Sequence, residues 1–341
     1  MSIIERDVAM GRTRDWHLGP PFGWRALAVL LVIVAVLGVS GQRVEVDRFL
    51  RLSGEAIAAN IGLAEKSQVG EGLGTMVRQL FPLAISERTE IARIPDFDPN
   101  DIPFLARIET VTETSTALDS NTLDMVETTS TTEYLVQPYG YVQRVIRLMI
   151  VTIEMGLWGT IIAVLLGLPL AIGAATNYTP HRSVYYACRA TVSFFRSLPE
   201  LITAMFLVLA FGFGPVAGIL ALGIHSAGFL GKFYAEDIED ADRKPQEALA
   251  ALGAGKLRVL RAAVLPQVMP SYVAYTLYIL DRNVRMATVV GLVGAGGIGL
   301  ELKGRFDMFQ YDHVGTILVA IFGTVLVLDQ VSARLRAKMI G

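Results

Sequence analysis

Hydrophobic positions along this 341-residue chain gather into long runs that polar segments separate. The first run covers residues 24–41, and its uncharged part, 26–41, would be about 24 Å long as a helix, slightly short of the ~30 Å hydrocarbon layer of a bilayer. Five more runs follow the polar segment 42–143. The pattern therefore predicts six transmembrane helices, at residues 24–41, 147–175, 188–211, 216–234, 269–290 and 313–332.

The first run has two interpretations. One is a cleaved signal peptide, because the run ends in the small-residue sequence VLGVSG. The other is a retained membrane helix, which we favour because the polar stretch 1–23 before it is long for a signal peptide. Residues 1–23 are then an N-terminal tail.

The polar segment 42–143 is acidic, with 16 acidic and 8 basic residues and so a charge of about −8 (8 − 16). Its part 53–83 has the periodicity of an amphipathic helix. Its part 109–133 is rich in Thr, Ser and acidic residues and has few large apolar groups to bury, which favours disorder. The same part alternates as strands do, so a partly β structure is an equal alternative.

Composition supports the membrane assignment. Hydrophobic residues make up 52% of the chain and charged residues 18%, whereas about a quarter of the residues of a soluble domain are charged. The single cysteine, Cys188, excludes an internal disulfide and a cysteine-based metal cluster. The four histidines have no metal-ligand spacing, and a G-x-S-x-G nucleophile motif is absent. We therefore expect no catalytic site and no metal site.

Basic residues near the ends of the runs indicate the orientation. They lie in the N-terminal tail, between the second and third runs, between the fourth and fifth, and after the sixth. With six spans all four positions fall on one side, which the positive-inside rule makes cytoplasmic. Both termini and the polar loop 235–268 are then cytoplasmic, and residues 42–143 are periplasmic. The residues concerned are Arg6, Arg12, Arg14, His181, Arg182, Arg243, Lys244, Lys256, Arg258, Arg261, Arg334, Arg336 and Lys338.

The loop 235–268 contains the sequence EALAALGAGKLRVLRAAVLPQVMP. A short helix is expected to carry Glu247 and Ala248, and Gly253 to break it. A second, basic amphipathic helix is expected to carry Lys256, and Pro266 to end it. Two short helices in a basic loop form a stiff element that another protein could grip, although an ordinary amphipathic connector is the alternative.

This loop resembles the EAA loop of ABC-importer permeases, which docks into a separate ATPase subunit. In that family the pattern is E-A-A, a glycine six residues after the glutamate, and then I-x-L-P. Leu249 replaces the second alanine here and Ala263 replaces the isoleucine. The matching residues, to which the resemblance assigns the coupling to the ATPase, are Glu247, Ala248, Gly253, Leu265 and Pro266.

Four ionisable residues lie inside the predicted spans, namely Glu200, His225, Arg282 and Arg285. A charge at this depth costs about 2.5–3.5 kcal/mol on insertion scales, so it needs a reason. One hypothesis is a positive lining for an anion path, with Glu200 as the counter-charge. The other is a structural ion pair between Glu200 and either arginine, and Arg285 could also pair with Asp281 on its own helix.

The segment 293–299 contains a G-x-G-x-x-G pattern, as in dinucleotide-binding loops. We reject that interpretation because no alternation of strands and helices surrounds the pattern. In membrane proteins glycines permit close backbone contact and break helices beside a path. We expect this segment to end the fifth span and to shape an outer gate through Gly294, Gly296, Gly297 and Gly299.

Longer stretches narrow the resemblance. FFRSLPELITAMFLVLAFGFGPVAGILALGIHSAGFLGKFYAEDIE and NVRMATVVGLVGAGGIG, with the loop between them, are similar to permeases of phosphonate/phosphite-type ABC importers. The resemblance covers about residues 145–341 and the first span. It implies an all-α polytopic membrane protein of six transmembrane helices with the type I importer (MetI-like) fold, of which 144–341 is the core and 42–143 an extra periplasmic segment.

The resemblance also implies partners in a bacterial inner membrane. They are a second permease subunit, expected to be identical, a cytoplasmic ABC ATPase dimer that uses ATP and Mg, and a periplasmic or lipid-anchored phosphonate-binding protein. The chain has no P-loop, so we expect it to be neither an enzyme nor the holder of a cofactor, and no nucleic acid is expected.

Two alternative functions stay open. One is the permease of a related importer for methionine or another small solute, because the loop motif alone fits it equally well. The other belongs to a different class, a membrane receptor that senses a ligand with residues 42–143. A receptor needs a cytoplasmic output domain, and the chain ends nine residues after the last predicted span.

Overall fold

The computed structural model describes residues 23–61, 67–95, 97–99, 102–103, 105–118 and 125–340. The expected N-terminal tail therefore lies outside the described residues except for Gly23. The chain forms two units, one up to Val77 and the other from Arg78 onward, and each is described by itself.

The first unit is helical. Helix α2 (Trp24–Arg43) corresponds to the first apolar run, and Glu45 follows it in the left-handed conformation, with φ 54°. Helices α3 (Val46–Asn60) and α4 (Gln68–Leu80) come next. The amphipathic pattern over 53–83 is thus divided between two helices, of which the last residues of α4 belong to the second unit.

The polar segment continues into a three-stranded antiparallel sheet made of β1 (Glu87–Glu90), β2 (Arg107–Leu118) and β3 (Met125–Gln137). The order is β1-β3-β2, with Glu87 opposite Gln137 and Arg107 opposite Val136. A 3-10 turn, Ile91–Arg93, follows β1. The Thr-rich part 109–133 is a hairpin of β2 and β3 on either side of residues 119–124, which are outside the described part.

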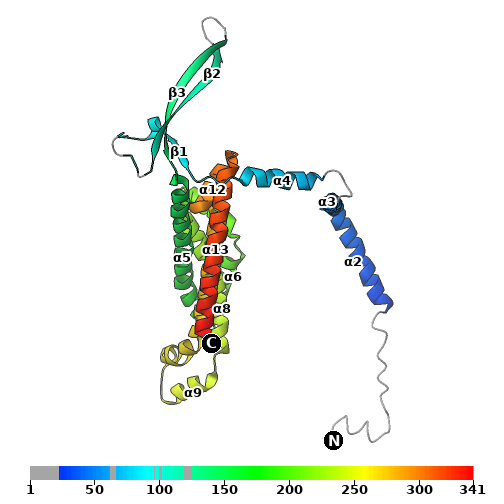
Figure 1. Cartoon of the computed structure of the whole chain (residues 1–341). Coiled ribbons are helices and arrows are strands. Elements are labelled where there is room, and N and C mark those ends of the chain that lie inside the picture. Colours follow the sequence, from blue (N-terminus) through cyan, green and yellow to red (C-terminus); the bar gives the residue numbers. More distant parts are fainter. Residues whose placement is uncertain are drawn as a thin grey trace. The chain divides into compact units, whose positions relative to one another are not determined.

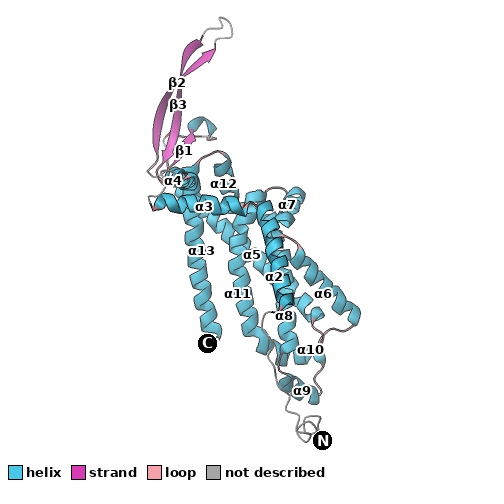
Figure 2. Cartoon of the chain, turned by 90° about the vertical axis from the view of Figure 1, so that its right-hand side faces the viewer, coloured by secondary structure: helices cyan, strands magenta, loops and turns pink. Residues whose placement is uncertain are grey.

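A helical bundle forms the rest of the second unit (Figures 1 and 2). Helix α5 packs most extensively against α8, and α11 contacts α5, α8 and α13. The strands adjoin the beginning of α5, which we call the sheet end, and α9 lies at the opposite, loop end (Figure 1). The helices are α5 (Gly140–Ala174), α6 (Arg182–Ser197), α7 (Glu200–Phe211), α8 (Pro215–Asp240), α9 (Arg243–Ala251), α10 (Lys256–Val259), α11 (Leu265–Val290), α12 (Gly297–Asp307) and α13 (Tyr311–Ile340), with π-helical turns at Leu260–Val264 and Gly291–Ala295.

Among the described residues, five helical segments are long and apolar enough to cross a membrane, and a bent pair of helices can form a sixth span. The bent pair is α6 and α7, which meet at 91° (Figure 2). The span predicted over 188–211 is thus present as two helices with a break between them and not as one continuous helix. Pro199 explains the break, because proline lacks an N–H and disfavours helical geometry at the preceding Leu198, whose ψ is 121°.

A second correction concerns Pro266, which was expected to end a helix. It lies instead in the first turn of α11, and α10, the π-helical turn and α11 run on as one helical segment from Lys256 to Ala295. A proline inside a continuous helix lacks the N–H for one backbone hydrogen bond. The wider π-helical turn before Pro266 accommodates the loss of this backbone hydrogen bond.

Glycine allows the central helices to approach closely. A Cβ atom at Gly156 of α5 would lie 2.8 Å from the backbone nitrogen of Val284 on α11. A Cβ atom at Gly159 would lie 2.9 Å from Cβ of Leu222 on α8. Small residues at helix contacts are how membrane helices gain van der Waals packing in the absence of a hydrophobic force between them.

Candidate functional site

Three of the four ionisable residues predicted inside the spans meet in one buried cluster. Arg282 on α11 places its Nη2 atom 2.5 Å from Oε1 of Glu200 at the start of α7. The same Nη2 lies 3.0 Å from Nε2 of His225 on α8, which is itself 3.0 Å from Glu200 Oε1. The side chains of Glu200 and His225 are 8% and 9% exposed, so the cluster ties three helices together in a largely dry environment.

Hydrogen bonds determine the form of the histidine. His225 Nδ1 lies 2.8 Å from the backbone oxygen of Leu198, which can only accept, so Nδ1 carries the proton that it donates. In the neutral ring Nε2 then accepts from Arg282, which also donates to the Glu200 carboxylate. The Arg282 guanidinium also lies over the ring of Phe229, 4.8 Å from its centroid.

Leu198 and Glu200 flank the break between α6 and α7, so the cluster holds that break in place. The Leu198 carbonyl has lost its helical partner, and His225 supplies a replacement donor. Arg196, near the end of α6, lies on the other side of the break from Glu200. Arg196 lies over the ring of Phe229, 5.9 Å from its centroid.

Arg285 does not join the cluster. It pairs with Asp281 one turn earlier on α11, and the Asp281 side chain is 4% exposed while that of Arg285 is 48% exposed. Of the pairings considered from the sequence, the structure thus contains Glu200 with Arg282 and Asp281 with Arg285. Arg282, with 26% of its side chain exposed, and Arg285 present the remaining guanidinium surface outward.

A second buried polar contact was missed by the sequence analysis. The Asn283 side chain donates to Thr160 on α5, at 3.0 Å, and accepts from Ser226 on α8, at 2.7 Å. Both Asn283 and Ser226 are 0% exposed. A lone asparagine among charged neighbours in an apolar run was the available signal, since a buried amide requires partners.

At the loop end, the predicted coupling residues lie on and around α9. Glu247 and Ala248 are exposed on α9, whose first turn is capped by Asp242 accepting from the Lys244 N–H at 3.0 Å. Gly253 follows with φ 85°, a conformation that strongly favours glycine, and a Cβ atom there would meet nothing within 4 Å. Of the remaining two, Leu265 is partly buried and Pro266 exposed at the start of α11.

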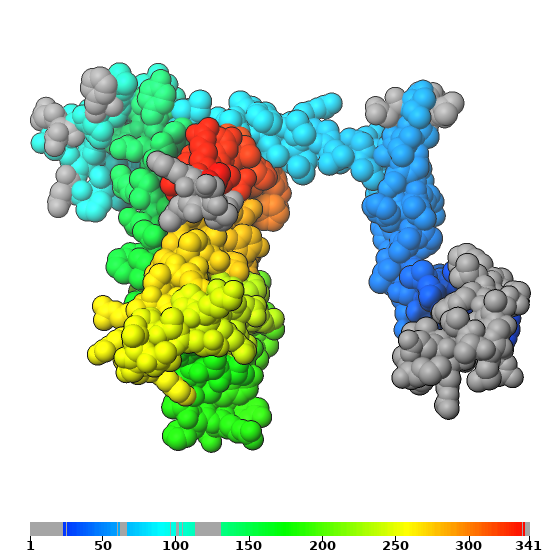
Figure 3. Space-filling view, turned by 90° about the horizontal axis from the view of Figure 1, so that it is seen from below, coloured from blue at the N-terminus to red at the C-terminus, as the bar shows by residue number. Residues whose placement is uncertain are grey.

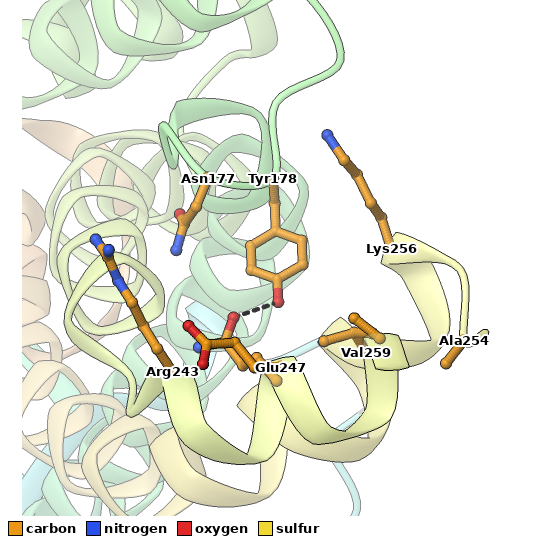
Figure 4. A pocket seen from close by; sticks show the side chains of 9 residues that line it. Asn177, Tyr178, Arg243, Glu247, Ala254, Lys256 and Val259 are labelled. Carbon is orange, nitrogen blue, oxygen red and sulfur yellow. Dashed lines mark hydrogen bonds between the residues drawn. The ribbon is translucent and has the colours of Figure 1, made fainter. Parts of the chain in front are cut away.

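A cavity of about 330 Å³ opens beside this helix (Figure 4). The Tyr178 hydroxyl donates to Gln246 Oε1 at 2.7 Å across its floor, and burial raises the pKa of Tyr178 above its ordinary value. Glu247 extends between Arg243 and Tyr178 in Figure 4. The nine lining residues are Asn177, Tyr178, Arg243, Gln246, Glu247, Ala250, Ala254, Lys256 and Val259.

The surface of this loop also carries two leucines that the sequence analysis did not select. Leu252 is 84% exposed and Leu257 is 78% exposed, one on each side of Gly253. Figure 3, seen from the loop end, shows the yellow residues of this loop at the surface. Exposed leucines beside a cavity are typical of a surface that another protein covers.

Polar contacts connect the loop to the bundle. Asp242 donates its backbone N–H to Gln267 at the start of α11, at 3.0 Å. Glu239 at the end of α8 accepts from the backbone of Thr176, at 2.7 Å, and pairs with Arg189 of α6, at 3.0 Å. Asp242 thus joins the start of α9 to α11, and Glu239 joins the end of α8, next to α9, to α6 and to the segment after α5.

The glycine segment at the sheet end contains a helix break, as expected. Gly294, Gly296 and Gly297 have φ values of 100°, 85° and 65°, and all four predicted glycines are buried. A Cβ atom at Gly294 would lie 2.5 Å from the ring of Phe213, and one at Gly299 2.0 Å from the backbone oxygen of Thr288. The segment thus ends the fifth span and packs tightly within the bundle, and its role in a gate stays a prediction.

Comparisons with known proteins agree with this arrangement. Residues 167–339 match the family described as binding-protein-dependent transport system inner membrane component. A putative phosphite transport system permease protein of Stutzerimonas stutzeri, HtxE, is 57% identical over 261 residues, which are 76% of this chain and 100% of the relative. The phosphite transport system permease protein PtxC of the same organism is 46% identical over 56% of this chain and 70% of its own length.

Among solved structures, the methionine ABC transporter MetNI in an inward-facing conformation is similar to the chain. The TM-score is 0.51 and the sequence identity 21%, over 57% of this chain and 95% of the other. This likeness concerns the fold of the bundle.

Proposed function

Because the chain belongs to the family of inner membrane components of binding-protein-dependent transport systems, we propose that it forms the path for phosphonate or phosphite-like anions in an ATP-driven importer. The observation that carries the choice of cargo is the 57% identity to the whole length of a phosphite permease relative, against 21% identity to the methionine transporter. The chain itself is the transmembrane subunit and a multi-pass membrane protein.

We propose that the loop between α8 and α11 binds the ATPase and receives its movement. A separate ATPase dimer, which supplies the P-loop, ATP and Mg, would cover Leu252 and Leu257 and contact Glu247 beside the cavity. The contacts of Asp242 and Glu239 would carry movement of α9 into the bundle. This assignment requires the loop end to be cytoplasmic, and we propose the same side for both termini, as the distribution of basic residues favours.

The cargo would enter from the sheet end, delivered by a periplasmic or lipid-anchored binding protein. Two copies of the chain would surround the path, because one copy leaves large apolar side chains of α5 and α13 exposed, and a bilayer and a second subunit must share them. These exposed side chains include Trp158 and Leu165 of α5 and Phe322 and Leu326 of α13.

The buried cluster would serve the path in two ways. Glu200 and His225 fix the break between α6 and α7, and Arg282 donates hydrogen bonds to both side chains. The exposed parts of the Arg282 and Arg285 guanidinium groups would then attract an oxyanion without holding it tightly, since their charges are already paired. Selectivity would lie mainly with the binding protein.

The test is transport by the complete complex in lipid. The chain is purified with its neighbouring ATPase and binding protein, and ATPase stimulation is measured with a panel of phosphonates, phosphite and methionine. Stimulation by a phosphonate or by phosphite, and not by methionine, is expected. Stimulation by methionine alone would contradict the cargo, and failure of the chain to bind an ATPase would contradict the function itself.

A further inference from the structure

Helices α3 and α4 each carry an apolar stripe of largely exposed side chains. We propose that the two helices lie in the headgroup–acyl boundary of the membrane, with their stripes inserted among the lipids.

The stripe of α4 consists of Val69, Leu73, Met76, Val77 and Leu80, which repeat at helical spacing. None of the residues of α4 is buried, and Leu73, Met76 and Val77 are 56%, 51% and 52% exposed. An apolar stripe of this kind on a helix with a polar opposite face is the pattern of interfacial membrane helices.

The stripe of α3 has the same form. Phe49, Leu50 and Ile57 fall on one side and are 68%, 63% and 61% exposed. The opposite side carries Arg48 and Glu55. Both helices therefore present one apolar and one charged face along their length.

The sequence of α4 also indicates that this helix is unstable unless another surface covers its apolar stripe. Gly70, Gly72 and Gly74 occupy every second position in its first half, and glycine weakens a helix relative to alanine. A 13-residue helix is marginal in water even with good helix formers, so burial of the stripe has to stabilise it.

Each end of the segment adjoins a candidate membrane span, which points to lipid as the surface that covers the stripes. Helix α2, a candidate span, ends at Arg43, and only two residues separate it from α3. At the other end Leu80 packs on Gly315 in the first turns of α13, where a Cβ atom would lie 2.5 Å from the Leu80 oxygen. Ala84 donates its N–H to Asp312 at 3.2 Å and accepts from Thr316 at 2.7 Å.

The charges of the two helices indicate which lipids suit them. Asp47 and Glu55 balance Arg48 and Arg51 on α3, and Glu71 balances Arg78 on α4. Insertion should therefore depend on apolar burial and not on anionic headgroups.

The experiment measures the depth of each face in the full complex reconstituted in nanodiscs. In a Cys188→Ser background, single cysteines at Leu73, Met76 and Thr75 carry nitroxide labels. Thr75 is the matched control, because it lies on the opposite side of the same helix and is exposed. Leu50 and Glu55 form the corresponding pair on α3.

Labels at Leu73 and Met76 should collide with a water-soluble nickel chelate about fivefold less often than a label at Thr75, and more often with oxygen. The ratio should be the same in phosphatidylcholine as in a mixture with phosphatidylglycerol. Equal nickel accessibility on both faces would overturn the proposal, because the helix would then lie in water. Shielding of Leu73 and Met76 from both reagents would also overturn it, because protein such as a second copy would cover the stripe.

A label could itself disturb α4, so a second variant is apolar. Met76→Trp should be quenched by lipids brominated near the headgroup, relative to the parent protein, whereas Thr75→Trp should not. Equal quenching of the two, or none of either, would contradict the proposed depth. These outcomes concern the bilayer alone and leave the cargo of the transporter unaffected.

Discussion

Arg282 on α11 and Glu200 at the first turn of α7 form a buried ion pair across the broken span, with Nη2 2.5 Å from Oε1. Removing one member of a buried pair leaves the other charge without compensation, which costs about 3–5 kcal/mol. The 26% exposure of the Arg282 side chain lets water reduce this cost, so the lower limit applies.

Arg282→Gln should therefore destabilise the chain by about 3 kcal/mol, and adding Glu200→Gln should recover part of the loss. Unfolding in detergent or lipid measures both. Arg93→Gln is the control, because its pair with Glu90 is an exposed one with an 80% exposed arginine, and a loss of less than about 1 kcal/mol is expected. Equal stability of Arg282→Gln and Arg93→Gln would contradict a structural role.

The buried Asn283 connects α5, α8 and α11 through Thr160 and Ser226. Side-chain hydrogen bonds between membrane helices contribute about 0.6 kcal/mol each, with a maximum near 1.7. Asn283→Ala should thus cost about 1–3 kcal/mol, and Thr160→Ala less, because it removes one of the two contacts. A double-mutant cycle between Asn283 and Thr160 checks the assignment, and a coupling of zero would exclude the contact.

Gly156 and Val284 bring α5 and α11 into backbone contact. Gly156→Ala should separate the helices and cost about 1–3 kcal/mol, because the nearest atoms include backbone that cannot rotate away. Gly323→Ala on α13 is the matched control, since a Cβ atom there meets nothing within 4 Å and alanine improves the helix. The comparison of the two unfolding transitions tests the packing, and an equally harmless Gly156→Ala would refute it.

The spans were predictable from the sequence because hydrophobic periodicity is local. The break before Glu200 was not predicted, although Pro199 was visible. A bend within a long apolar run leaves the composition of the run unchanged, so the hydrophobic pattern does not indicate it. Helix rotation about its own axis was also undetermined, so the sequence could not say whether Arg282 or Arg285 meets Glu200.

The Asn283 contact shows more clearly what could not be predicted from the sequence. Its partners are 123 and 57 positions away in the chain, and only the packing of three helices brings them together. In contrast, Asp281 and Arg285 lie one turn apart, so their pairing was an open possibility from the sequence alone. The break at Gly253 was anticipated for the same reason, since glycine between two short helices is a local signal.

Tyr178 connects the end of α5 to α9 through its hydrogen bond with Gln246. Burial raises its pKa, so the folded chain favours the protonated form. The contribution to stability is complete below the unfolded pKa of about 10 and is lost as pH rises through the higher folded value. Tyr178→Phe should cost about 1 kcal/mol at neutral pH, and the difference from the parent should shrink in alkali. Unfolding of both proteins as a function of pH measures this, and a constant difference would contradict it.

Gly253 offers the sharpest test of the coupling loop, because its φ of 85° demands glycine while the space around it is open. Gly253→Ala should therefore strain the turn by about 1 kcal/mol without any clash, shifting Leu252 relative to Leu257 and reducing cargo-stimulated ATPase activity several-fold while the bundle stays folded. Gly255→Ala is the matched control, since Gly255 has φ −68° and equally open surroundings, and it should retain full stimulation. Equal stimulation of the two variants would mean that the geometry of this turn does not transmit movement from the ATPase.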